Sequence, residues 1–216
     1  NYTPIAYASY FARLQYNYAN KYYVSGIIRR DGSSQFKQNE KYWGTFPSVS
    51  AAWNISNEEF LKDSNVISFL KLRGGWGRLG NADVPYNYTT ISTSTVSDNA
   101  NYVFGPGQDL IYGAYIGSPA YDISWEIVDE WSAGLDFELL KGKLSGSLDY
   151  YNKTTKNTIL NIKQIGSSPY EKDFYDHAAK VVNQGFEIAL NYRNETAGGF
   201  RYSIGGNFND NENDVK

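Results

Sequence analysis

The sequence predicts an all-β protein in which about eight antiparallel strands form a segment of a transmembrane β-barrel. Three observations predict this class: apolar and polar residues alternate in eight segments, the connections include short and long ones, and aromatic residues gather at segment ends. Aromatic residues make up 17% of the 216 residues, yet the mean hydropathy is −0.53. Alternation reconciles the two values, because one face of a strand can be apolar while its average composition stays polar.

Four alternating segments occupy the first part of the chain, over residues 6–18, 22–31, 46–55 and 67–78. The apolar parity of these segments is marked in turn by Leu14, Val24, Val49 and Leu72. Charged residues fall on the other parity, namely Arg13, Arg29, Lys71 and Arg73. Each segment therefore has an apolar face and a polar face, as a half-buried strand does.

Four more segments follow the same pattern over residues 129–140, 143–153, 184–193 and 199–209. Their apolar parity is marked by Leu135, Leu148, Ile188 and Ile204. The polar parity again carries charges, namely Asp136, Glu138, Asp149, Glu187, Arg193 and Arg201. Arg30 and Asp129 are exceptions that fall on the apolar parity, and both are expected at strand ends beside a loop.

The connections distinguish a membrane barrel from an ordinary sheet. Those over residues 19–21, 141–143 and 194–199 are short, whereas those over about 30–45, 79–124 and 154–183 are long. Residues 56–65 form a compact linker in which Ser56 to Glu59 is expected to act as a capping box. Short turns at one end and long loops at the other are typical of outer-membrane barrels, so the long connections are expected to be extracellular.

Aromatic residues near the strand ends are expected at the two lipid–water interfaces. The candidates are Tyr18, Tyr22, Trp53, Trp76, Trp131 and Tyr192. The opposite face is rich in Ser, Gly, Asn and charge, which would fill the interior of a small barrel poorly and suits a wetted lumen or the surface of a plug. We therefore expect eight strands of a larger barrel. A soluble carbohydrate-binding β-sandwich and a self-contained eight-stranded barrel are the alternatives.

Composition excludes several classes of function. The chain has no cysteine and one histidine, His177, which is expected in a polar loop, so thiol chemistry and histidine-rich metal sites are excluded. A net charge of −3 provides no electrostatic basis for nucleic-acid binding. Neither an enzymatic activity nor a cofactor is predicted. No apolar run approaches the roughly 20 residues of a membrane helix.

Two short motifs are rejected as ligand sites. Residues 75–80 match G-x-G-x-x-G, but no helix is expected to follow, as nucleotide binding requires. Residues 210–214 place oxygens at alternate positions, but they lack the central glycine of a calcium loop and are expected to begin a solvated loop.

The long connection over 79–124 carries aromatic residues among amide and hydroxyl side chains. Candidates for contact with a ligand or a lid are Tyr86, Tyr88, Tyr102, Phe104 and Tyr112. Aromatic faces of this kind suit sugar rings or extended peptides, although the same residues could instead pack the loop on itself.

Three stretches of the chain read Y-F-A-R-L over residues 10–14, R-R-D-G-S-S-Q-F over 29–36 and W-G-T-F-P-S-V-S-A-A-W over 43–53. In this order they resemble the S-Y-F-G-R-L, R-R-D-G-S-S-x-F and W-G-x-F-P-S-x-S-x-x-W stretches of the SusC/RagA family of TonB-dependent outer-membrane transporters of Bacteroidetes. Residues 134–136, 148–152 and 183–187 continue the series, so the resemblance spans about 7–209. Residues 74–77 depart from it, since G-G-W-G stands where the family commonly has A-S-Y-G.

The resemblance implies that residues 1–216 are part of one β-barrel domain of about 22 strands in the outer membrane. It places the plug domain, the TonB box and the signal peptide upstream. It further implies import of oligosaccharides or oligopeptides, a SusD-like lipoprotein partner, and energy from TonB–ExbB–ExbD. The candidates for contact with substrate or plug on the polar face are Arg13, Arg29, Arg73, Asp136 and Glu187.

Overall fold

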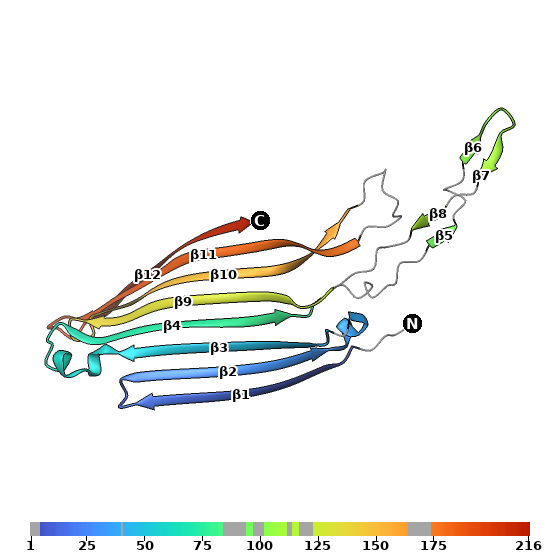
Figure 1. Cartoon of the computed structure of the whole chain (residues 1–216). Coiled ribbons are helices and arrows are strands. Elements are labelled where there is room, and N and C mark those ends of the chain that lie inside the picture. The colour runs from blue at the N-terminus through green and yellow to red at the C-terminus, as the bar shows by residue number, and fades with distance from the viewer. Residues whose placement is uncertain are drawn as a thin grey trace.

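Eight long strands form one antiparallel sheet in chain order in the computed structural model, which describes residues 5–39, 41–83, 94–96, 102–111, 114–116, 123–163 and 174–216 (Figure 1). The strands are β1 (Tyr7–Tyr18), β2 (Tyr22–Ser33), β3 (Trp43–Asn54), β4 (Ile67–Asn81), β9 (Glu126–Leu139), β10 (Leu144–Ile162), β11 (Phe174–Glu195) and β12 (Arg201–Val215). The prediction of an all-β fold with eight antiparallel strands is confirmed.

Short elements occupy parts of the connections. β5 (Ser94–Val96) pairs with β8 (Ala114–Ile116), and β6 (Tyr102–Phe104) pairs with β7 (Asp109–Ile111). Three 3₁₀ turns are η1 (Ser34–Asn39), η2 (Ile55–Asn57) and η3 (Glu59–Leu61). Among the described residues, no helix has the length and apolar content needed to cross a membrane.

The short turns gather at one end of the sheet, which we call the turn end, and the opposite end is the mouth end (Figure 1). Ala19 and Asn20, between β1 and β2, both have positive φ, at 53° and 54°. Asn17 stabilises this turn, because its Oδ1 accepts the backbone N–H of Asn20 at 3.1 Å. Gly142, at φ 79°, permits the turn between β9 and β10.

The strands extend further towards the mouth end than the alternation predicted. β10 and β11 remain paired up to Ile162 and Phe174, so much of the expected loop over 154–183 is strand. Residues 210–214, expected to begin a loop, lie inside β12. The alternation of apolar with polar residues stops before the strands do, because beyond Tyr150 the apolar parity of β10 continues with the polar Asn152.

The register brings the apolar residues of all strands onto one face. Directly opposed residues share a face in antiparallel pairs, and Leu14, Gly26, Val49, Trp76 and Trp131 form one such row across five strands. Leu14 is 76% exposed, so this face is not packed against a second sheet in the described part of the chain. The β-sandwich alternative is therefore wrong. β1 and β12 lie at opposite edges of the open sheet, so the chain is not a self-contained barrel either.

Candidate functional site

The apolar face carries a band of apolar residues, aromatic residues and glycine, which we call the apolar band. Polar residues mark the edge of this band nearest the mouth end. The first charged or amide residue on the mouth side of the band, strand by strand, is Arg30 on β2, Arg78 on β4, Asp129 on β9, Asn152 on β10, Gln184 on β11 and Asp210 on β12. Each follows a run of apolar or aromatic residues and glycine on the same parity. The band therefore has a defined edge rather than a gradual fading of hydrophobicity.

This edge is inclined to the hydrogen-bonded rows of the sheet. Arg78 pairs with Asp129, but Asn152 pairs with Trp131, which lies two residues nearer the turn end than Asp129. Asp210 pairs with Phe186, which lies two residues nearer the turn end than Gln184. The edge thus descends by about one residue per strand, which corresponds to about 35° for a rise of about 3.3 Å and a strand spacing of about 4.8 Å. Strands of membrane barrels tilt by about 35–45°.

Aromatic side chains line the band at the turn end. Tyr18 stacks on Tyr22 with ring centroids 6.4 Å apart, and Tyr22 stacks on Trp53 at 6.3 Å. At the other edge of the sheet, the rings of Tyr192 and Tyr202 lie 6.2 Å apart. Tyr18, Tyr22 and Trp53 therefore form one stack at the turn end, and Tyr192 lies at the same end on the opposite side of the sheet.

Glu58 joins the polar ends of this aromatic stack. Its carboxylate accepts hydrogen bonds from the Tyr22 hydroxyl at 2.6 Å, from Lys21 Nζ at 2.9 Å and from Trp53 Nε1 at 3.1 Å. These donors, with Tyr22 first, lower the pKa of Glu58 from 4.5 to about 2. The expected capping box is wrong, because η2 and η3 have no side-chain cap: the Ser56 hydroxyl donates to Asn54 Oδ1, and the Glu59 carboxylate pairs with Lys62.

Trp76 and Trp131 lie opposite each other on β4 and β9 at the mouth end of the band. The ring of Trp131 is 5.2 Å from that of Tyr150. Trp76 is 37% exposed and Trp131 46%, so both rings face outwards. The interface candidates therefore form two groups, one at each edge of the band.

An ion network lies on the polar face, where β4, β9 and β10 adjoin. Arg73 Nε donates to Asp136 Oδ2 at 3.1 Å, and Arg73 Nη2 reaches Asp149 Oδ1 at 2.6 Å. Arg73 lies opposite Gly134, whose missing side chain leaves the space that the guanidinium and the Asp149 carboxylate occupy. Sequence reasoning placed Arg73 and Asp136 on one face, but it did not join Asp149 to them, because that pairing depends on the register.

The other candidates on the polar face lie apart from this network. Arg29 pairs with Asp31 of its own strand at 3.2 Å, and the exposed Arg13 lies opposite Ile27. Glu187 is exposed and lies opposite Asp149, so two carboxylates face each other across β10 and β11. Arg73 holds one of the two and thereby reduces their repulsion.

Charge on the polar face changes sign across the sheet. β1 to β4 contribute mainly cations, namely Arg13, Arg29, Lys71 and Arg73, against Asp31. β9 to β11 contribute mainly carboxylates, namely Glu130, Asp136, Glu138, Asp149 and Glu187, against Lys153 and Arg193. The Arg73 network lies where the two regions meet.

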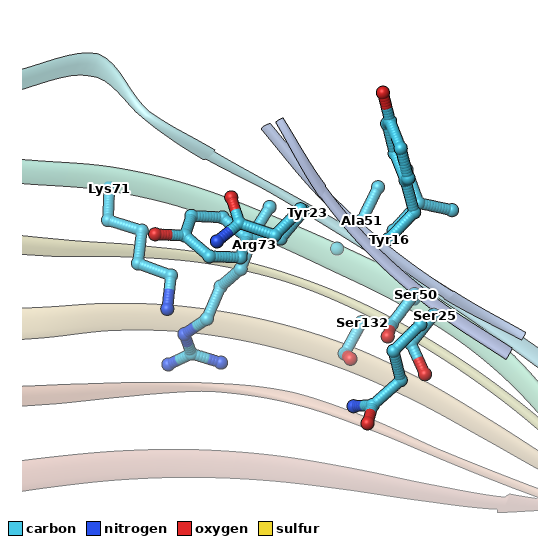
Figure 2. A pocket seen from close by; sticks show the side chains of 14 residues that line it. Tyr16, Tyr23, Ser25, Ser50, Ala51, Lys71, Arg73 and Ser132 are labelled. Carbon is cyan, nitrogen blue, oxygen red and sulfur yellow. The ribbon is translucent and has the colours of Figure 1, made fainter. Parts of the chain in front are cut away.

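A hollow of about 650 Å³ lies beside this boundary. Small residues of one row form its floor: Ser25, Ser50, Gly75 and Ser132. Figure 2 shows Lys71 and Arg73 projecting on the same side as these serines, whereas Tyr16 and Ala51 point to the other side. Lys71 also lies over the ring of Tyr23, with Nζ 5.8 Å from the centroid. The hollow therefore combines hydroxyl groups, an aromatic ring and two cations.

Of the five candidates for contact with a ligand or a lid, two lie within the described residues. Tyr102 is 65% exposed in β6, and Phe104 ends the same strand. Tyr86, Tyr88 and Tyr112 lie outside the described residues.

The whole chain, residues 1–216, matches the model of one protein family, described as TonB dependent receptor-like, beta-barrel. The chain belongs to this TonB-dependent receptor family. The TonB-dependent receptor SusC of Bacteroides thetaiotaomicron is 32% identical over 209 residues, which are 96% of this chain and 20% of that protein. A TonB-dependent receptor of Formosa agariphila is 34% identical over 207 residues, with 95% and 20% covered.

Solved structures have a similar fold. The RagAB peptide transporter superposes with a TM-score of 0.78 at 25% identity, over 98% of this chain and 22% of that one. The siderophore receptor PirA of Pseudomonas aeruginosa superposes with a TM-score of 0.59 at 14% identity, which shows the fold alone. The chain thus spans about a fifth of the length of its curated relatives.

A small buried core lies at the mouth end of this TonB-dependent receptor sheet, and sequence reasoning missed it. It consists of Phe36, Phe46, Ile123 and Trp125. The Trp125 ring is 5.2 Å from Phe36 and 5.3 Å from Phe46. Gly44 and Gly80 provide the space for Phe46, since a Cβ at either position would meet its ring. The spacing of Gly44 and Phe46 was the available signal, but it was not interpreted as a sign of buried packing.

His177 connects three segments at the mouth end. Its Nε2 accepts the backbone N–H of Ser124 at 3.0 Å, and its Nδ1 lies 2.6 Å from the carbonyl oxygen of Asn157. Because Nε2 is an acceptor, Nδ1 carries the proton and donates it. His177 lies in β11, whereas the sequence predicted a loop at this position. Its two hydrogen bonds hold the segment before β9 against β10 and β11.

Among the described residues, no group of histidine and carboxylate side chains could hold a metal ion. Residues 75–80 lie within β4, which is the wrong context for nucleotide binding.

Proposed function

We propose that this chain forms eight neighbouring strands in the wall of an outer-membrane barrel that imports oligosaccharides or oligopeptides. The inclined apolar band is the observation that carries the proposal. Its edge follows the tilt of barrel strands, and its exposed residues suit lipid better than water. Members of the TonB-dependent receptor family are outer-membrane proteins, and transport rather than catalysis is the activity proposed here.

The polar face then lines the interior of the barrel. Arg13, Arg29, Arg73, Asp136 and Glu187 contact either substrate or a plug domain in this proposal. The change of charge sign across the face suits a partner that carries both charges, because complementary potentials orient it. The exposed Tyr102, together with Phe104, Tyr86, Tyr88 and Tyr112, would meet the ligand or a lid.

The partners follow from the family relationship. A SusD-like lipoprotein would cover the mouth end, and TonB–ExbB–ExbD would supply energy through a part of the protein outside this chain. The likeness to the RagAB peptide transporter supports the oligopeptide alternative, and the likeness to SusC leaves the oligosaccharide alternative open.

Cysteine accessibility tests the assignment of the two faces, because the chain itself contains no cysteine. Leu148→Cys and Ser147→Cys are neighbours on opposite faces of β10. In the complete protein, freed of other cysteines and embedded in outer membrane, a water-soluble maleimide should label Ser147→Cys and spare Leu148→Cys. Equal labelling of both would contradict the proposal. Growth of a deletion strain complemented with this protein, on an oligosaccharide or an oligopeptide as sole source, would then identify the substrate class.

A further inference from the structure

Three cations on β2, β4 and β10 lie on the apolar face, on the mouth side of the band. Arg30 and Arg78 are the first polar residues on the mouth side of the band on β2 and β4, and Lys156 lies further along β10. Only one strand, β3, separates Arg30 from Arg78 in the sheet, so their strands are about 10 Å apart. We call these three residues the cationic rim.

The cationic rim is held in place by neighbours on the same face. Arg78 donates from Nε and Nη2 to the two oxygens of Asp129, at 2.7 and 3.0 Å, and Lys156 Nζ reaches Asp129 at 3.0 Å. Asp129 is only 14% exposed, whereas Arg78 is 39% and Lys156 49% exposed. One enclosed carboxylate thus orients two accessible cations, and the group keeps a net positive charge.

A tryptophan ring lies beside each arginine of the rim, Trp43 on the mouth side of Arg30 and Trp76 on the band side of Arg78. The Arg30 guanidinium carbon lies 5.6 Å from the ring centre of Trp43, and that of Arg78 lies 5.9 Å from Trp76. Trp43 is 42% exposed and Trp76 37%, so both rings are accessible beside their cations. An accessible ring next to a guanidinium suits a partner that has an apolar part and an anionic part.

The rest of the edge has a different character. On β12 the same face carries Asp210, Glu212 and Asp214, and Gln184 donates to Glu212 at 2.9 Å. Lys180 on β11 and Lys216 after β12 are further cations at this end, and Lys216 pairs with Asp214 at 3.1 Å, so this part of the edge is mixed in charge.

We propose that the cationic rim binds the phosphate groups of lipid headgroups in the leaflet that surrounds the mouth end. The inference rests on the proposed function, since it requires lipid against the apolar band. A lipid is favoured over a soluble anion because the cations adjoin that band and its tryptophans. Arginine donors recognise phosphate oxygens, and each cation near a charged membrane surface adds about fivefold to binding.

The test uses the complete protein in nanodiscs of phosphatidylcholine that contain a minor fraction of phosphatidic acid. Native mass spectrometry counts the phosphatidic acid retained, with phosphatidylcholine-only discs as the baseline. Arg30→Ala/Arg78→Ala should retain about 25-fold less tightly bound phosphatidic acid, by the same fivefold per cation. Lys62→Ala/Arg201→Ala is the matched control, because it removes two exposed cations near the turn end and should change nothing.

Three outcomes would overturn the inference. The double variant could retain as much phosphatidic acid as the control variant, or inorganic phosphate at millimolar concentration could displace the lipid, which would indicate a soluble-anion site. The third outcome concerns Trp131, whose share of the tryptophan fluorescence is identified by its loss in Trp131→Phe. If lipids with brominated acyl chains fail to quench that share, the apolar band is not in lipid and the proposed function fails with it. Quenching without a difference in lipid retention would overturn the cationic rim alone.

Discussion

The two faces of this sheet are built from the same strands, yet their charged residues lie at different positions along those strands. The apolar face holds its charges at the edge of the band, at Arg78 and Asp129, where they pair outside the apolar run. The polar face holds Arg73, Asp136 and Asp149 beside the middle of the strands. On the apolar face, among the described residues, a charge is therefore found only beyond the band, whereas on the polar face charges also occur along the middle of the strands. Lipid outside and water or protein inside would produce this difference.

The largest effect is expected from a charge moved between the faces. Leu148→Arg places a cation within the apolar band and should lower the free energy of unfolding by about 2–4 kcal/mol in lipid. Ser147→Arg, one residue away on the polar face, should change it by less than about 1 kcal/mol. Denaturant unfolding of the complete protein in lipid vesicles measures both. Equal losses would show that the faces do not differ in surroundings.

Glycines on the two faces give a second, smaller contrast. A Cβ at Gly146, on the apolar face, would meet the backbone oxygen of Ala189, whereas a Cβ at Gly134 would meet the ends of the Asp149 and Arg73 side chains. Backbone cannot move aside as a flexible side chain can, so Gly146→Ala should cost about 1–3 kcal/mol. Gly134→Ala should cost less and mainly displace the ion network. The same unfolding assay decides, and a larger loss for Gly134→Ala would reverse the comparison.

The Arg73 network is expected to matter more for function than for stability. Its three members remain 39%, 31% and 22% exposed, so water screens them. Arg73→Ala should lower stability by only about 1 kcal/mol, while it leaves two carboxylates, Asp136 and Asp149, without their cation. We expect transport by the complete protein to fall more than its stability does. Arg201→Ala, which removes an exposed cation of the same parity near the turn end and outside this network, is the control, and equal transport losses would remove the special role of Arg73.

How far the sequence could predict this molecule depends on the kind of contact. Alternation and turn residues act between near neighbours, so Leu14 or Arg73 could be assigned to a face from the sequence alone. The pairing of Arg73 with Asp149 depends on register across β9, and the core of Phe36, Phe46 and Trp125 depends on segments far apart in the chain. Residues 210–214 were misplaced for a different reason: the edge of the apolar band was taken for the end of the strand. The backbone of β12 continues its pairing to Val215, whatever the polarity of its side chains.

The smallest effect concerns the turn end. There the Glu58 carboxylate, which belongs to neither face, joins the linker that follows β3 to the turn between β1 and β2. Glu58 has a folded-state pKa of about 2 against an ordinary value of 4.5, so its contribution to stability is complete above about pH 4.5 and is lost as the pH falls towards 2. Glu58→Gln should be less stable than the parent at neutral pH, and the difference should disappear as the pH falls to about 2. Thermal unfolding across this range measures it, with Glu59→Gln as control, since Glu59 contacts only the exposed Lys62 of its own segment among the described residues. A difference that persists at pH 2 would mean that the amide fits the site poorly for reasons of shape, and that the charge of Glu58 is not what joins Tyr22, Trp53 and Lys21.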